Sequence, residues 1–190
     1  MQELTRHIGI QLKTLRTQRG WSLTQAAEET GVSKAMLGQI ERGESSPTVA
    51  TLWKIASGFQ ASFSQFLQSP PITADMLHPY DPPTAFDSKS CGMSVVSFFP
   101  YDSELNMDML VVELQVAGYS ESSAHAAGVI EHVIVIAGQL ALTVNGSDHL
   151  LAAGEGLRFR ADCPHTYRNH SSEKVRFHDI IHYPAADAAS

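Results

Sequence analysis

One short stretch near the N-terminus could read the edges of DNA bases. Its polar or small residues share one face if the stretch is helical, and they are Lys34, Ala35, Gly38 and Gln39. Gln39 can pair with adenine, Lys34 can contact guanine or a phosphate, and the Ala35 methyl group can meet that of thymine. Gly38 would let the helix backbone approach DNA closely. The opposite face is apolar and is expected to pack on a core, through Met36, Leu37 and Ile40.

Capping residues predict the two helices that would position this face. Ser22 can cap a helix over about residues 23–30, and Gln25, three residues later, completes a capping box. Gly31 favours a left-handed end to that helix. Ser33 can then cap a second helix that reaches about residue 41 and ends by Gly43. Two short helices joined by a tight glycine turn make a helix-turn-helix.

Three further helices are expected around this pair. Apolar residues recur at steps of three and four over residues 4–19 and again over 48–59. A short fifth helix is expected over 62–67, with Ser62 as its cap. The five helices resemble the XRE (lambda-repressor/Cro-like) family over about residues 4–68, through Gly31, Ser33, Ile40, Glu41, Gly43, Pro47 and Thr48.

That resemblance implies DNA binding through residues matching Ser33, Lys34, Ala35 and Gln39. We add Gly38 and Arg42, from the same helix and its end, to the residues expected at DNA. A single unit of this kind makes few base contacts, so such domains usually read two half-sites about one DNA turn apart as a dimer. The expected partners are therefore a double-stranded operator and a second copy of the chain.

Charge divides the sequence into two unlike halves. Residues 1–70 hold seven Lys/Arg and five Asp/Glu, whereas 71–190 hold six and fifteen, within a net charge of −7. The second half is therefore not expected to contact phosphates. The two cysteines do not make a disulfide framework, and neither a signal-peptide pattern nor a long apolar run is present. These features predict a cytoplasmic protein without membrane association.

The second half has the pattern of a β domain. Residues 1–68 are expected to form the helical domain, 69–92 a proline-rich linker and 93–185 the second domain. Short β-like runs alternate with turn signals and favour an all-β sandwich or barrel. These runs cover residues 93–99, 110–117, 132–137, 140–144, 157–160 and 175–182.

Two stretches of this domain resemble the motifs of the cupin family, a double-stranded β-helix or jelly roll. They are Gly118-x6-His125-x-Ala127-x3-Glu131-x6-Gly138 and Gly154…Pro164-His165-x3-Asn169, and the resemblance covers about residues 105–183. It implies a divalent metal held by His125, Glu131 and His165, with Ala127 where the family has a second histidine. Two nitrogen ligands and one oxygen ligand suit zinc with an open position, or iron. Zinc is the expected cofactor.

Further side chains could take part in the site. Cys163 and His178 are candidates for a replacement ligand, whereas His132 is expected to point away from the barrel. Effector contacts are expected from Tyr119, Arg160, Tyr167 and His178. Arg160 or Arg158 could bind a carboxylate, although only alternate strand residues face inward.

The sequence thus predicts a non-enzymatic transcription regulator of XRE–cupin type, similar to regulators linked to sulfur-compound utilisation. That resemblance implies an amino acid or small sulfur compound as effector. Two alternatives remain open at this point. One is a metal-dependent cupin enzyme, a dioxygenase or isomerase, fused to a DNA reader. The other is a cupin domain that only dimerises.

Overall fold

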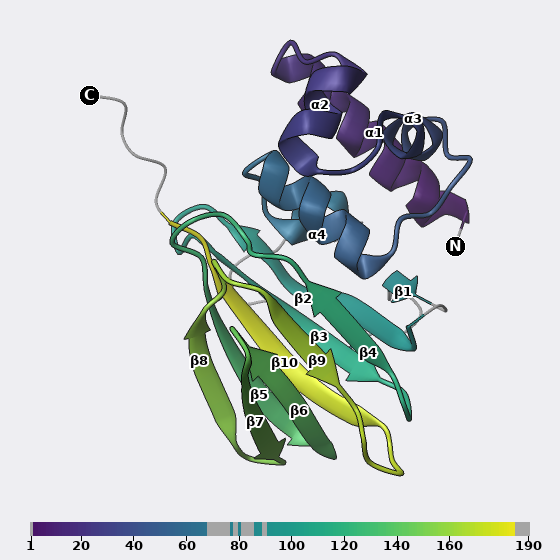
Figure 1. Cartoon of the computed structure of the whole chain (residues 1–190). Coiled ribbons are helices and arrows are strands. Elements are labelled where there is room, and N and C mark those ends of the chain that lie inside the picture. The colour runs from purple at the N-terminus through teal and green to yellow at the C-terminus, as the bar shows by residue number, and fades with distance from the viewer. Residues whose placement is uncertain (1, 68–76, 78–79, 81–85, 89–90, 185–190) are drawn as a thin grey trace. The chain divides into compact units, whose positions relative to one another are not determined.

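The chain forms two compact units, Met1–Pro71 and Ile72–Ser190, in the computed structural model. The structure describes residues 2–67, 77, 80, 86–88 and 91–184. Figure 1 shows that the first unit is helical and the second is built of strands. The expected linker, 69–92, lies largely outside the described residues, but its residues Phe86–Ser88 form a strand, β1, that pairs with β2.

Within residues 2–67, the helical unit contains four α-helices and one 3₁₀ turn. They are α1 (Gln2–Gln18), α2 (Leu23–Thr30), α3 (Lys34–Glu41), α4 (Val49–Gly58) and η1 (Phe63–Phe66). The predicted fifth α-helix is therefore wrong in type, and Ser62 makes no side-chain cap. Phe63 and Phe66 are both fully buried. Because a 3₁₀ helix has three residues per turn, a single turn suffices to bury this pair on one side.

The predicted caps of the helix-turn-helix are confirmed. Ser22 Oγ accepts a hydrogen bond from the Gln25 amide, and the Gln25 side chain accepts one from the Ser22 amide. Gly31 ends α2 in the left-handed conformation, with φ 65°. Ser33 Oγ accepts from the Met36 amide and so begins α3. Each cap satisfies amide groups that a helix start leaves without an intrahelical partner.

The position of α3 is set by α1. Arg16 on α1 forms two hydrogen bonds with the Glu41 carboxylate at the end of α3, of 2.6 and 2.9 Å, and a third with the Trp21 carbonyl. Gly9 brings the two helices close together, because a Cβ atom there would lie 2.4 Å from the carbonyl oxygen of Ile40. Both tryptophans of the chain belong to this unit, and each packs against a phenylalanine: Trp21 on Phe59 and Trp53 on Phe63.

The described strands of the second unit form two antiparallel sheets. The six-stranded sheet has the order β1-β2-β3-β10-β5-β8, and the four-stranded sheet has the order β4-β9-β6-β7. The strand bounds are Phe86–Ser88, Met93–Asp102, Met107–Leu114, Tyr119–Ser122, Ile130–Ala137, Gln139–Val144, Ser147–Ala152, Gly156–Arg160, His165–Arg168 and Val175–His182, for β1 to β10. Tyr167 of β9 stacks on Phe177 of β10, with ring centroids 5.4 Å apart, so the inner faces of the two sheets meet.

The six predicted strand runs are all present, whereas β1, β4, β7 and β9 were not predicted. Strands β4 and β9 are only four residues long and rich in polar residues. Strand β7 follows a hairpin turn at Asn145 and Gly146, which both have positive φ, as a type I′ turn requires. No helix in the described part of the chain is both long and apolar enough to cross a membrane.

Candidate functional site

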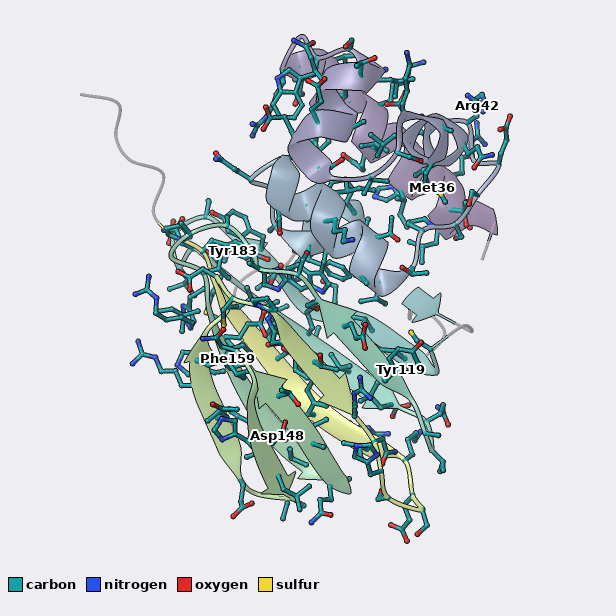
Figure 2. The ribbon with its side chains drawn as sticks, viewed as in Figure 1. Met36, Arg42, Tyr119, Asp148, Phe159 and Tyr183 are labelled. Carbon is teal, nitrogen blue, oxygen red and sulfur yellow. The ribbon has the colours of Figure 1, made fainter. Side chains whose placement is uncertain are left out.

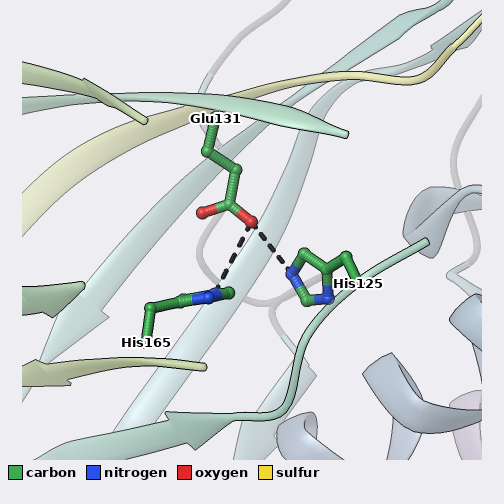
Figure 3. A group of neighbouring side chains, drawn as sticks. All are labelled: His125, Glu131 and His165. Carbon is green, nitrogen blue, oxygen red and sulfur yellow. Dashed lines mark ion pairs between the residues drawn. The ribbon is translucent and has the colours of Figure 1, made fainter. Parts of the chain in front are cut away.

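Three buried side chains meet inside the β unit and form a candidate metal centre. His125 Nε2 lies 2.9 Å from Glu131 Oε1, and His165 Nε2 lies 3.7 Å from the same oxygen (Figure 3). The three ligand atoms all lie within 4.8 Å of one another. Each side chain is at most 3% exposed. This is the set that the cupin resemblance implied.

Strand alternation explains why these residues converge. On β5, Glu131 is in phase with the buried residues Val133 and Val135, and on β9, His165 is in phase with Tyr167. His125 precedes β5 in a loop, where its amide donates a hydrogen bond to the Ala161 carbonyl and so fixes the backbone. Two strands from different sheets and one anchored loop therefore supply the three side chains.

The protonation states at the centre suit a metal ligand set. Burial lowers the pKa of His165, so its imidazole is neutral at pH 7. Its Nδ1 lies 2.9 Å from the Cys163 carbonyl oxygen, which places the proton on Nδ1 and leaves a lone pair on Nε2. Burial would raise the pKa of Glu131, but His125, His165 and the Tyr167 hydroxyl together outweigh burial and lower the pKa. The carboxylate is therefore charged.

The residues present fit a divalent cation. Within the described residues, His165 Nε2 is buried without a hydrogen-bond partner, and Glu131 Oε1, which it faces at 3.7 Å, has a close contact with His125 Nε2. Buried polar atoms are normally paired, so a cation at this position would satisfy the His165 nitrogen. Two imidazole nitrogens and one carboxylate oxygen match zinc with a further position open, or the facial arrangement of non-haem iron.

Of the four residues expected to contact an effector, only Tyr167 lies at this centre. Its hydroxyl donates a hydrogen bond to Glu131 Oε2. Burial raises the pKa of Tyr167 well above its ordinary value, so the phenol is protonated and acts as a donor. It thereby holds one carboxylate oxygen and leaves the other, Oε1, toward the two histidines.

The other three expected effector residues face away from the barrel interior. On β8 the buried residue is Phe159 (Figure 2). Arg158 and Arg160 therefore both point outward, and Arg160 pairs instead with Asp162. His178 alternates with buried residues of β10 and stacks on Phe98. Tyr119 is 45% exposed, beneath Arg168, in a surface cavity of about 270 Å³. The structure thus places Tyr119, Arg160 and His178 away from the candidate metal centre.

No replacement ligand joins the three residues in the described part of the chain. Cys163 donates a hydrogen bond from Sγ to the Arg160 carbonyl, and His178 lies on the outer face. Ala127 is exposed. His132 also lies on the outer face, as expected, where its ring packs against His182.

Two acidic residues of the interior were not predicted. Asp108 on β3 and Asp179 on β10 are 0% and 5% exposed. Burial, together with the nearby carboxylates of Glu131 and Asp108, raises the pKa of Asp179 well above its ordinary value. The signal in the sequence is the period of two, since Asp179 is in phase with the buried apolar residues of β10.

The candidate DNA-reading face on α3 is partly as expected. Ser33, Lys34, Ala35, Gln39 and Arg42 are all exposed. Two residues lie on the opposite side of the helix from the one expected. Gly38, expected to face DNA, is buried, and Met36, expected in the core, is 37% exposed (Figure 2). A Cβ atom at position 38 would contact the Arg42 side chain and Leu23, because α2 and Arg42 close over that side of the helix. Arg42 itself is paired with Glu44.

Comparisons with known proteins agree with both halves of this description. The helix-turn-helix family model matches residues 12–66, and the cupin domain model matches residues 110–181. The chain is 52% identical to the HTH-type transcriptional regulator SutR of Escherichia coli (strain K12), over 97% of this chain and 99% of that protein. It is 26% identical to the HTH-type transcriptional regulator PuuR of the same organism, over 86% and 88% of the two chains.

A solved structure matches over the same extent. The crystal structure of an HTH_3 family transcriptional regulator from Vibrio cholerae has a TM-score of 0.83 and 40% identity, covering 96% of this chain and 98% of that one. These relatives carry the names of regulators, and none of the three is named as an enzyme. The chain therefore belongs to the XRE helix-turn-helix transcriptional regulators with a C-terminal cupin domain.

Proposed function

We propose that this regulator binds an operator as a homodimer in the cytoplasm and senses a small metabolite, an amino acid or sulfur compound, inside its cupin unit. The observation that carries the sensing role is the buried cluster of His125, Glu131 and His165. A regulator that only dimerised through this unit would have no need of two histidines and a carboxylate gathered in its interior, because leaving a buried atom such as His165 Nε2 without a partner costs stability.

The DNA-binding role is assigned to the exposed side of α3 and its two ends. Lys34, Ala35 and Gln39 are available for base contacts in the major groove, and Ser33 and Arg42 for contacts at the flanks. One such helix contacts only a few base pairs. A dimer that reads two half-sites gives the specificity that a single helix lacks, and we assign the dimer contact to the cupin unit.

His125, Glu131 and His165 would hold zinc as three protein ligands. Bound zinc would offer an open position to an amine, thiolate or carboxylate of the effector. The chain's own residues prepare that site: the Cys163 carbonyl fixes the tautomer of His165, and Tyr167 orients the Glu131 carboxylate. Because Ala127 stands where the family has a histidine, the protein supplies three ligands to the metal.

Effector binding and DNA binding are coupled through thermodynamic linkage. An effector that binds one state of the dimer more tightly shifts DNA affinity by the ratio of its two affinities. A coupling free energy of about 1–3 kcal/mol, which is about 5–150-fold, is sufficient for a switch.

The test combines metal analysis with operator binding. Wild-type protein and the double variant His125→Ala/His165→Ala are purified without chelator, and zinc is measured by elemental analysis. We expect about one zinc per wild-type chain and none in the variant. Operator fragments are selected from genomic DNA, and their binding is followed by fluorescence anisotropy with and without candidate metabolites.

The variant should keep its operator affinity but lose the metabolite response, because α3 is untouched. The control is His149→Ala, which removes a histidine of β7 outside the cluster and should leave zinc content unchanged. Stoichiometric zinc in the double variant, or an unaltered metabolite response without zinc, would contradict the proposal.

A further inference from the structure

Three buried carboxylates share one inner face of the six-stranded sheet. Ile181 of β10 lies opposite Asp108 of β3 on one side and opposite Glu131 of β5 on the other. Asp179, two residues earlier on β10, points to the same face. It is therefore a diagonal neighbour of both acids, and diagonal neighbours in antiparallel strands lie about 7–8 Å apart. Only Glu131 belongs to the candidate metal centre.

The hydrogen bonds of these carboxylates leave Asp179 unsatisfied. Glu131 Oε2 accepts from Tyr167, and Asp108 Oδ2 accepts from the Tyr183 hydroxyl at 3.2 Å. Asp179 Oδ1 is buried without a hydrogen-bond partner, and no Lys or Arg forms an ion pair with Asp179, in the part of the chain that the structure describes. A buried carboxyl group without a partner either keeps its proton, which is the direction of the raised pKa of Asp179, or ionises beside a cation that accompanies it.

We propose that Asp179, with Asp108, forms a subsite for the ammonium group of a primary amine, beside the metal ligands. This rests on the proposed sensing role and names the chemical class of the effector. A second metal ion fits less well. Calcium and magnesium need six or more oxygen ligands, far more than two aspartates supply, and the imidazoles that zinc prefers belong to the first centre. An ammonium group needs only acceptors for its three donors.

The spacing suits a small amino compound. Because Asp179 is a diagonal neighbour of Glu131, a molecule with a short carbon chain can place its ammonium group at Asp179 and a second polar group at the metal position. An amino acid satisfies this requirement, whereas its hydroxy-acid analogue, which lacks the positive charge, does not.

The test uses probe pairs that differ only in the ammonium group. They are L-alanine against L-lactate, L-methionine against its 2-hydroxy analogue, and propylammonium against propanol. Binding to zinc-loaded full-length protein is measured by calorimetry at up to about 20 mM probe. We expect at least one amine to bind at least about tenfold more tightly than its hydroxyl partner, as for a charge-assisted hydrogen bond.

The variant Asp179→Asn should lose this preference and keep its zinc. Asp108→Asn is a second variant that should weaken the same preference, and it serves if the first does not fold. The matched control is Asp102→Asn, which makes the same change at an exposed turn and should behave as wild type. Zinc content is measured in each protein. A variant that keeps its zinc but loses the amine preference has lost the subsite and not the metal centre.

Several results would overturn the subsite. They are no amine preference in the wild type, the same preference in Asp179→Asn, loss of zinc from that variant, or two zinc ions per wild-type chain. Operator binding measured on the same samples keeps the two proposals apart. A preference for amines without any operator response would refute the sensing role alone. An operator response to hydroxyl probes that survives Asp179→Asn would refute the subsite alone.

Discussion

Replacing Gly9 with alanine tests how α1 sets the position of the DNA-reading helix. In most helices this substitution is stabilising, because alanine has the higher helix propensity by about 1 kcal/mol. Here the new Cβ atom would lie 2.4 Å from the Ile40 carbonyl oxygen and 3.2 Å from that of Glu41. Both are backbone atoms of α3, so no side-chain rotation can relieve the contact. Helix propensity therefore predicts that Gly9→Ala stabilises the protein, whereas packing predicts that it destabilises the protein.

The size of the clash decides whether Gly9→Ala stabilises or destabilises the protein. An ordinary contact needs about 3.4 Å, so α3 must move by about 1 Å relative to α1, which is overpacking of the kind that costs about 1–3 kcal/mol. Because the clashing atoms belong to the backbone and cannot rotate away, we take the cost at the upper end of this range, about 3 kcal/mol. Subtracting about 1 kcal/mol of propensity leaves a net loss of about 2 kcal/mol. For a domain of this size, that lowers the unfolding midpoint by about 10 °C.

Gly38→Ala is the matched control, since it makes the same change within a helix of the same unit. Its Cβ atom would meet Arg42 Nη1 at 3.1 Å and Leu23 Cδ1 at 3.8 Å. The Arg42 side chain is 58% exposed and can move aside. The propensity gain should therefore prevail, and we expect about 0.5–1 kcal/mol of stabilisation.

Tryptophan fluorescence measures both effects in the full chain, because Trp21 and Trp53 both belong to the helical unit. Thermal and urea unfolding should place Gly9→Ala below the wild type and Gly38→Ala above it. If Gly9→Ala is as stable as the wild type or more so, the close approach of α1 and α3 is not the constraint inferred here.

Two further predictions concern the reading helix and the β unit. Gln39→Ala should cost about 1–3 kcal/mol at one base position and relax preference there, as measured by binding to operators varied base by base; an unchanged preference would remove Gln39 from the reading face. Burial opposes ionisation of Glu113, but hydrogen bonds from Lys174 and Arg176 outweigh it and lower its pKa. Its stabilising effect is therefore present above about pH 4.5 and is lost as the pH falls. Glu113→Gln should reduce stability by about 1–2 kcal/mol at pH 7, and the difference from wild type, followed by circular dichroism, should shrink as the pH falls through the lowered pKa of Glu113. A difference that stays constant with pH would contradict this account.

Local signals allowed the helix-turn-helix to be predicted closely. The caps at Ser22 and Ser33 and the turn at Gly31 involve residues within four positions of each other, so the sequence carries the whole interaction. The faces of α3 were harder to predict. Gly38 is buried because Leu23 and Arg42 pack over it, and that contact depends on how α2 docks rather than on the periodicity of α3.

The residues of the candidate metal centre could likewise be predicted from local motifs, whereas the carboxylates around it could not. His125, Glu131 and His165 could be assigned because they match two short motifs. For Asp179, the sequence shows only that it is in phase with the buried residues of its own strand. Its closeness to Asp108 follows from the register of β10 with β3, which lies about seventy residues away along the chain. Such register depends on the packing of both strands, which local pattern does not contain.

The order of the strands has a consequence for synthesis of the chain. Residues 2–67 fold through contacts within one continuous segment, whereas the six-stranded sheet places its last strand, β10, between β3 and β5. That sheet cannot close until residues 175–182 have been made. Domains near the N-terminus generally fold first during translation, and sheets with distant pairings form slowly. Each newly made molecule thus acquires its helix-turn-helix unit before its cupin unit, and passes through a stage in which the first is folded and the second is not.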